Sequence, residues 1–111
     1  MINVGDSIPS VWFNYRQDDD WQSFNTHESW TGKRVLVFAL PGAFTPTCSS
    51  QQLPGYEELY NDFQEAGIDE VYCLSVNDTF VMNAWFELQG VENVKALPDG
   101  NFEWTSRVGA L

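Results

Sequence analysis

The chain has 111 residues, of which 43% are hydrophobic and 15% aromatic, and this size and composition indicate one folded globular domain over residues 1–111. Its formal net charge of −11 opposes contact with phosphate backbones and anionic lipid, so nucleic-acid and membrane-surface roles are disfavoured. The sequence also lacks the roughly 18 to 20 continuous apolar residues of a membrane helix, and its N-terminus has no secretory signal pattern.

Residues 1–34 alternate short apolar pieces with turn residues, which is typical of a small β-hairpin region. The run Asp18-Asp19-Asp20 is expected to form a solvated turn between the two strands. His27 is the only histidine and lies in a turn-rich stretch, residues 25–29, so we expect it at the surface.

Residues 35–40 form an apolar run without polar alternation, which predicts a strand covered on both faces, as in the centre of an α/β sheet. Residues 49–66 carry apolar residues at helical spacing, and Gly67 is suited to end that helix. The apolar face of this helix is expected to comprise Leu53, Tyr56, Leu59, Tyr60 and Phe63.

Residues 71–76 predict a second buried strand, and Asn77 and Asp78 can cap a second helix that ends at Gly90. The predicted buried face of that helix consists of Phe80, Val81, Ala84, Trp85 and Leu88. Residues 94–97 predict a third strand, followed by a turn at residues 98–100 and a short helix over residues 102–108. A hairpin followed by βαβαβα predicts a parallel sheet with right-handed crossovers.

The segment between the first of these strands and its helix reads Pro41-Gly42-Ala43-Phe44-Thr45-Pro46-Thr47-Cys48. A cysteine in the first turn of a helix is expected to have a lowered pKa, because unpaired backbone N–H groups and the helix dipole favour the thiolate. Such a thiolate can attack a disulfide, a carbonyl or thioester, or the O–O bond of a peroxide. The hydroxyl of Thr45 can point back toward the sulfur, and Pro41 and Pro46 restrict the loop and limit solvent. A small, partly dry pocket with hydroxyl and N–H donors suits a peroxide best.

The second cysteine, Cys73, lies in the middle of an apolar strand, which favours a packing role. The sequence has no Cys-x-x-Cys, which argues against an ordinary dithiol oxidoreductase, and His27 is not a plausible base for a Cys-His hydrolase. Two cysteines are too few for a disulfide scaffold and their spacing suits no zinc site, so we expect no metal and a reducing, cytoplasmic location.

The stretch Pro-Gly-Ala-Phe-Thr-Pro-Thr-Cys-Ser, residues 41–49, resembles the active-site motif of peroxiredoxins. With Leu53-Pro54 and residues 75–85, the chain resembles the peroxiredoxin-5 subfamily, and within it the bacterial forms fused to, or served by, glutaredoxin. The resemblance covers essentially the whole chain. It implies a single, partial thioredoxin-like α/β sandwich with an N-terminal β-hairpin, lacking the last strands and helix of the family.

By this resemblance Cys48 is the peroxidatic cysteine, Thr45 holds the substrate oxygen and Pro41 shields the thiolate. A hydroperoxide would oxidise Cys48 to a sulfenic acid, and an external thiol would reduce it without any bound cofactor. The reductant implied is glutathione with glutaredoxin, and thioredoxin is the alternative.

The resemblance also implies a homodimer or higher oligomer. Phe44, Phe80 and Trp85 are candidates for the contact, although core packing explains Phe80 and Trp85 equally well. Peroxiredoxins further use an arginine on a later strand, which falls beyond Leu111 in the family pattern; Arg107, on a predicted surface helix, is not assigned this role. The leading hypothesis is therefore a thiol peroxidase. A truncated, weakly active redox-sensing or interaction module is the alternative, and a thioredoxin-like disulfide exchanger is disfavoured because the second active-site cysteine is missing.

Overall fold

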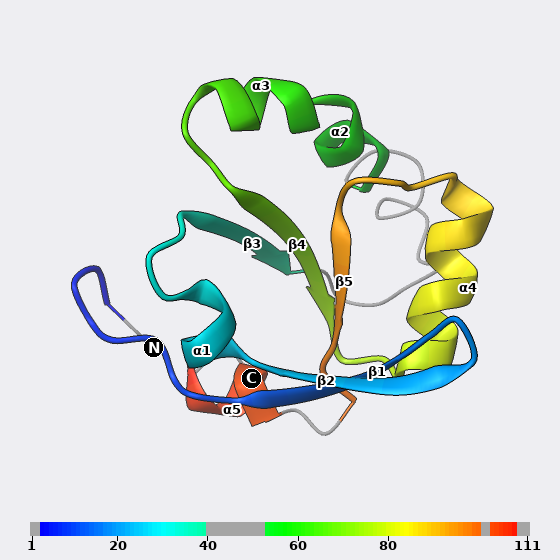
Figure 1. Cartoon of the computed structure of the whole chain (residues 1–111), viewed down its shortest axis with the longest axis horizontal. Helices are drawn as coiled ribbons and strands as arrows, with labels where there is room; N and C mark the ends of the chain where they lie inside the picture. The colour runs from blue at the N-terminus through cyan, green and yellow to red at the C-terminus, as the bar shows by residue number, and fades with distance from the viewer. Residues whose placement is uncertain (1–2, 40–52, 101–102, 109–111) are drawn as a thin grey trace.

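The computed structural model describes residues 3–39, 53–100 and 103–108, and it places an antiparallel hairpin beside a three-stranded parallel sheet (Figure 1). The hairpin strands are β1 (Trp12–Gln17) and β2 (Asp20–Asn25), and the sheet has the order β3 (Val35–Ala39), β4 (Glu70–Ser75), β5 (Lys95–Pro98). The helices in the described residues are α1 (Thr26–Trp30), α2 (Leu53–Glu58), α3 (Tyr60–Glu65), α4 (Thr79–Gln89) and α5 (Glu103–Arg107). Within those ranges, none of the helices has the length and apolar character needed to cross a bilayer.

The predicted hairpin and its acidic turn are confirmed. Gln17 pairs with Asp20 at the end of the ladder, so that Asp18 and Asp19 form a two-residue connection. Their φ angles are 51° and 63°, and two successive positive φ values give the turn a twist that matches the twist of the strands. Aspartate adopts this conformation more readily than most residues, so the acidic run suits a tight turn.

His27 is exposed, as expected, but it lies in the short helix α1 and not in a turn. The helix forms because the side chain of Asn25 accepts a hydrogen bond from the backbone N–H of Glu28, which satisfies one of the unpaired donors of the first turn. Residues 25–29, which were interpreted as turn-forming, therefore contain the cap and the first residues of a helix.

The alternating order of strands and helices and the parallel sheet are confirmed. β4 pairs in parallel with β3 on one side and with β5 on the other, and it is buried along almost its whole length. The strand predicted to be central, β3, lies at the edge of the described sheet and is mostly half-buried, with Ala39 exposed. An unbroken apolar run therefore identified a strand but not its position in the sheet.

The helix predicted over residues 49–66 is two helices, α2 and α3, separated at Leu59. Leu59 was expected on the buried face but is 47% exposed. Gly67 ends α3 as predicted: its φ is 97°, and the N–H of Ile68 donates to the carbonyl of Phe63. Residues 49–52 lie outside the described ranges.

The start and end of α4 are confirmed, whereas its predicted buried face is right for Trp85 but wrong for Phe80 and Leu88. Asp78 caps the helix by accepting from the N–H of Val81, and Gly90 ends it with φ 69°. Phe80 and Leu88 were expected in the core but are 58% and 71% exposed. The buried residues of the helix are Thr79, Met82, Trp85 and Phe86. Because apolar residues occur nearly all round this helix, their spacing did not decide which side would be buried.

Two hydrophobic clusters lie on opposite faces of the sheet. The helix-side cluster contains Phe38, Leu53, Val71, Cys73, Met82, Trp85, Phe86 and Val94. The hairpin-side cluster contains Val11, Phe13, Trp30, Tyr72, Leu74, Leu97 and Trp104. Successive residues of β4 enter alternate clusters, as the two-residue period of a strand requires.

Asp99 was predicted in a turn and has a larger role, since it joins the ends of β4 and β5 to α5. Its carboxylate is 3% exposed and accepts hydrogen bonds from the N–H groups of Trp104 and Thr105 and from the Thr105 hydroxyl. Its own N–H donates to the carbonyl of Ser75 at 2.9 Å.

We expect Asp99→Ala to lower the free energy of unfolding by about 3 kcal/mol, because it leaves two backbone N–H groups and one hydroxyl without their buried acceptor. Urea denaturation followed by tryptophan fluorescence measures this loss. The matched control is Asp78→Ala, which removes an exposed cap with one N–H donor and should cost about 1 kcal/mol. Equal losses in the two variants would contradict the role given to Asp99.

Candidate active site

The parallel strands β3, β4 and β5 end at Ala39, Ser75 and Pro98, and these ends form one edge of the sheet, called here the carboxyl edge. Ligands of open α/β sheets bind outside this edge. The predicted motif, residues 41–48, follows β3 at this edge. Pro41, Phe44, Thr45 and Cys48 themselves lie outside the described residues, so their roles stay predictions.

The elements on either side of the motif are anchored in the same core. Leu53, the first residue of α2, is fully buried in the helix-side cluster together with Phe38 of β3. The ring of Phe38 also stacks on Tyr56 of α2, with centroids 3.8 Å apart and an interplanar angle of 7°. The strand that precedes the motif and the helix that follows it are therefore held against each other.

The second motif, residues 75–85, forms the connection from β4 to α4 at the carboxyl edge. The Ser75 hydroxyl donates to Asn77 Oδ1 at 2.6 Å, and Asp78 begins the helix. Met82 and Trp85 are fully buried and fix α4 on the sheet. Trp85 is thus a core residue, and the suggestion that it contributes to a subunit contact is wrong.

Two polar residues of α4 bind the backbone of the hairpin, a contact that sequence reasoning missed. Thr79 Oγ1 accepts from the N–H of Arg16 at 2.9 Å, and Asn83 Nδ2 donates to the Arg16 carbonyl at 2.8 Å. Thr79 and Asn83 are four residues apart and so lie on one side of the helix. In the sequence, two polar residues four positions apart could have indicated a contact on this side of the helix. The spacing does not show which segment they bind.

Glu57 of α2 also makes contacts that the sequence did not indicate. One carboxylate oxygen accepts from the N–H groups of Asn93 and Val94 at 3.0 and 2.9 Å, and the other accepts from Asn93 Nδ2 at 2.9 Å. Burial acts to raise the pKa of Glu57, but the N–H groups of Val94 and Asn93 outweigh it and hold the pKa below its ordinary value. The charged form therefore stabilises the fold at neutral pH, and this contribution is lost as the pH falls through the lowered pKa.

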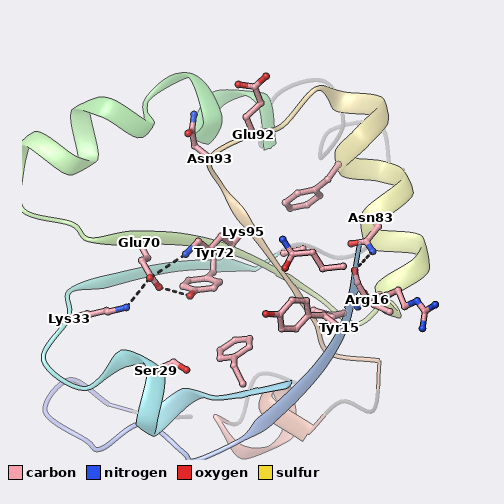
Figure 2. Close-up of a pocket in the computed structure, with 16 residues that line it drawn as sticks. Tyr15, Arg16, Ser29, Lys33, Glu70, Tyr72, Asn83, Glu92, Asn93 and Lys95 are labelled. Atoms are coloured by element: carbon pink, nitrogen blue, oxygen red, sulfur yellow. Dashed lines mark hydrogen bonds and ion pairs between the residues drawn. The ribbon is translucent and has the colours of Figure 1, made fainter. Parts of the chain in front are cut away.

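A cavity of about 630 Å³ lies between β5, α4 and the hairpin, with a charged cluster at one end (Figure 2). There, Lys33 and Lys95 bind the same oxygen of Glu70 at 3.1 and 3.3 Å, and the Tyr72 hydroxyl donates to the other oxygen. Burial, reinforced by the hydrogen bond to Glu70, raises the pKa of Tyr72, so that this hydroxyl stays protonated. Glu70 and Lys95 begin their strands, so the cluster lies at the end of the sheet opposite the carboxyl edge.

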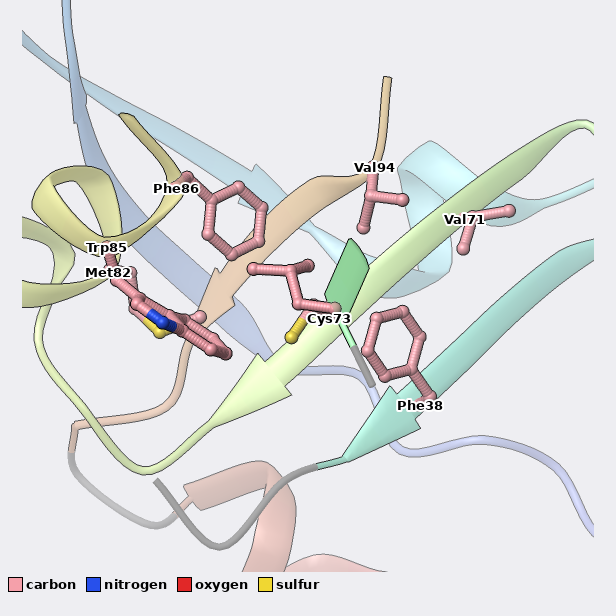
Figure 3. Packing of buried hydrophobic residues seen from close by; sticks show 8 residues of the cluster. Phe38, Val71, Cys73, Met82, Trp85, Phe86 and Val94 are labelled. Carbon is pink, nitrogen blue, oxygen red and sulfur yellow. The ribbon is translucent and has the colours of Figure 1, made fainter. Parts of the chain in front are cut away.

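Cys73 has no exposed surface, and its side chain lies among the aromatic and aliphatic residues of the helix-side cluster (Figure 3). The packing role predicted for it is confirmed. Across the described ranges 3–39, 53–100 and 103–108, no three His, Cys, Asp or Glu side chains are grouped so as to hold a metal ion.

Arg107 lies on the surface helix α5, as predicted. Its guanidinium donates to the carbonyl of Ser10 at 3.1 Å and pairs with Glu103 at 3.4 Å. These contacts tie α5 to the segment that precedes β1, and they agree with assigning Arg107 no catalytic role.

Comparison with known proteins gives consistent matches over nearly the whole chain. The family model described as Redoxin matches residues 3–111. A "Peroxiredoxin" of Rhizobium etli is 50% identical, over 94% of this chain and 63% of the relative. The "Hybrid peroxiredoxin hyPrx5" of Haemophilus influenzae is 51% identical, over 96% of this chain and 44% of the relative. The chain thus spans about half to two thirds of the length of these curated relatives.

The fold also matches that of a solved structure. The crystal structure of reduced Prx3 in complex with H2O2 from Vibrio vulnificus is similar with a TM-score of 0.93 and 38% identity, covering 98% of this chain and 69% of that one. This confirms the thioredoxin-like α/β fold and the resemblance carried by residues 41–49 and 75–85. The chain belongs to the redoxin family and, within it, to the peroxiredoxins.

Proposed function

We propose that this chain carries the peroxide-reducing site of a thiol peroxidase, with Cys48 as the nucleophile. The observation that supports it is the motif of residues 41–48, which follows β3 at the carboxyl edge in a chain whose fold matches a peroxiredoxin crystallised with H2O2. The Cys48 thiolate attacks one oxygen of a hydroperoxide, an S–O bond forms and the O–O bond breaks. The leaving oxygen takes a proton and departs as water or an alcohol, and the sulfur, oxidised by two electrons, remains as a sulfenic acid.

Two further residues act on the peroxide in this proposal. The Thr45 hydroxyl donates a hydrogen bond to the substrate oxygen and stabilises the charge that develops on it. Pro41 shields the thiolate from solvent, which strengthens such electrostatic contacts. Hydrogen peroxide and small organic hydroperoxides are the substrates that a pocket of this kind would accept.

An external thiol completes the cycle. The thiol attacks the sulfur of the sulfenic acid and releases water, and a second thiol then reduces the mixed disulfide. The complete burial of Cys73 favours this route over an internal disulfide. Glutathione with glutaredoxin is the proposed reductant, and thioredoxin is the alternative. The proposed cycle uses no bound cofactor. We propose that the protein is cytoplasmic, because the cytoplasm keeps thiols reduced.

We also propose that a second copy of the chain covers an aromatic patch made of Trp12, Trp21 and Phe80. These side chains are 57%, 58% and 58% exposed, and the rings of Trp21 and Phe80 meet edge to face at 5.7 Å. All three line a hollow of about 220 Å³ beside the carboxyl edge. Contiguous exposed aromatic residues are typical of protein interfaces, so the patch supports self-association.

We expect the wild-type chain to react with H2O2 much faster than free cysteine, and Cys48→Ser to abolish the reaction. Stopped-flow mixing followed by tryptophan fluorescence measures both. Thr45→Val should slow the reaction about 100-fold, because it removes one donor to the developing charge.

A wild-type rate no greater than that of free cysteine would exclude peroxidase activity. Trapping of a Cys48 sulfenic acid with dimedone, without turnover, would instead favour the weakly active redox-sensing module.

Cys73→Ala should leave peroxide turnover with glutathione and glutaredoxin within about twofold of wild type, because a buried packing residue takes no part in resolution. The same variant assayed with thioredoxin compares the two reductants. Cys73→Ser serves as the matched substitution that buries a hydroxyl, and it should lower stability by about 1–2 kcal/mol with turnover retained. A large loss of turnover in Cys73→Ala, with the fold intact, would show that Cys73 resolves the sulfenic acid.

Phe80→Asp should weaken self-association at least tenfold in sedimentation velocity, because it places a charge in the apolar patch. The control is Leu88→Asp on the same helix, where the side chain is more exposed and lies outside the hollow. Since each copy carries a net charge of −11, added salt should strengthen the wild-type association. A monomeric wild-type chain at high concentration and high salt would overturn this proposal.

A further inference from the structure

We propose that the cavity between the hairpin, α4 and β5 binds a small aromatic carboxylate, with the carboxylate on Lys33 and Lys95 and the ring against the aromatic side chains of the cavity wall (Figure 2). Its volume of about 630 Å³ lies within the range of sites for small organic ligands. Such a site combines apolar walls with a few polar groups that fix the orientation of the ligand. This binding is separate from the reduction of peroxide.

Two ammonium groups at one end of the cavity supply the anion site. Lys33 Nζ and Lys95 Nζ contact the same carboxylate oxygen of Glu70, at 3.1 and 3.3 Å, so both can contact one further carboxylate as well. Each ammonium group has three donors, and one contact leaves the others available. The two lysine side chains are 45% and 53% exposed, whereas that of Glu70 is 16% exposed. The cluster therefore presents its positive charges and covers its negative one.

The end of the cavity that holds the lysines keeps an excess of one positive charge. Glu70 neutralises only one of the two ammonium groups, and its second oxygen accepts from the uncharged hydroxyl of Tyr72. The other charged side chains of the lining are directed elsewhere. The guanidinium of Arg16 lies over the ring of Trp21, 5.6 Å from its centroid, and the carboxylate of Glu92 points away from the lysines (Figure 2). An anion is therefore attracted to this end, although the chain as a whole has a net charge of −11.

An aromatic wall continues from the lysines along the cavity. The Lys95 ammonium lies over the ring of Tyr72, 5.8 Å from its centroid, and that ring stacks on Phe24 with centroids 6.0 Å apart. Tyr15 meets Phe24 edge to face at 6.1 Å. Phe86 of α4 also lines the cavity. Rings attract other rings in stacked and edge-to-face arrangements, so this wall favours an aromatic ligand over an aliphatic one.

The direction of β5 sets the shape of the ligand. The cavity is lined along this strand from Lys95 to Pro98, a distance of about 10 Å for three residue steps. A ligand that reaches from the lysines along the wall therefore needs a short chain between its ring and its carboxylate. Arylalkanoates such as 4-phenylbutanoate have this form.

The first test compares ligands on the wild-type chain by isothermal titration calorimetry. We expect 4-phenylbutanoate to bind once per chain with a Kd below about 1 mM. The neutral amide 4-phenylbutanamide should bind at least about tenfold more weakly, because it lacks the charge that the lysines attract. Acetate, which lacks the ring, should also bind more weakly by at least about tenfold. Added salt should weaken the binding of 4-phenylbutanoate.

The second test compares basic residues inside and outside the cavity. Lys33→Gln and Lys95→Gln should each weaken binding of 4-phenylbutanoate about tenfold and leave binding of 4-phenylbutanamide within about twofold, because each removes one ammonium group. The matched control is Arg107→Gln, which changes the net charge equally but lies on α5, outside the cavity lining. It should leave both affinities within about twofold of wild type.

Amide NMR shifts locate the ligand independently of any variant. Binding in the cavity should shift the resonances of Lys95, Ala96 and Asn83, which line it, and should leave Glu103 and Trp104 of α5 unchanged. Equal affinity for the carboxylate and the amide, an equal loss in Arg107→Gln, absence of saturation, or shifts confined to α5 would each overturn the proposal. Binding is measured without peroxide or a thiol reductant, so the result does not depend on peroxidase activity.

Discussion

The burial of β4 between two hydrophobic clusters is the constraint on which the rest of the structure depends. Its residues alternate between the clusters, with Val71 and Cys73 on the helix side and Tyr72 and Leu74 on the hairpin side. Each buried side chain of this size contributes about 1.5–3 kcal/mol of transfer free energy, and a shift of one residue would exchange the two faces. Since β3 and β5 take their registers from β4, the three carboxyl ends meet where the predicted nucleophile follows β3.

Polar contacts then fix what apolar packing leaves free. Asp99 joins the ends of β4 and β5 to α5, and Thr79 with Asn83 joins α4 to the hairpin. Glu57 joins α2 to β5. These contacts use backbone groups, and those of Glu57, Thr79, Asn83 and the Asp99 N–H link segments distant in the chain. Such groups are costly to leave unpaired when buried, so these contacts define positions as well as adding stability.

The two ends of the sheet carry different side chains, although charged residues occur at both. Lys33 and Lys95, two of the five basic residues, share the carboxylate of Glu70 at the end of the sheet away from the carboxyl edge. The exposed aromatic residues Trp21 and Phe80 lie instead beside the carboxyl edge, around the smaller hollow.

Local chemistry was sufficient to predict the features that depend on neighbouring residues. The acidic turn at Asp18, the cap at Asp78 and the helix ends at Gly67 and Gly90 each follow from the conformations that these residues favour. The identity of the predicted site also depended on sequence alone, because the spacing of Pro41, Thr45 and Cys48 is itself the motif.

Tertiary structure decided the features for which the sequence allows more than one solution. Apolar residues surround α4, so only packing against the sheet could bury Trp85 and expose Phe80. The apolar run of β3 fits an edge or a central strand equally well, and only strand pairing placed it at the edge of the described sheet. Glu57 and Glu58 are the same residue type side by side, and only one of them meets Asn93 and Val94. The sequence by itself determined the local conformations and the reactive motif, whereas the faces, edges and polar links depend on contacts between segments that are distant in the chain.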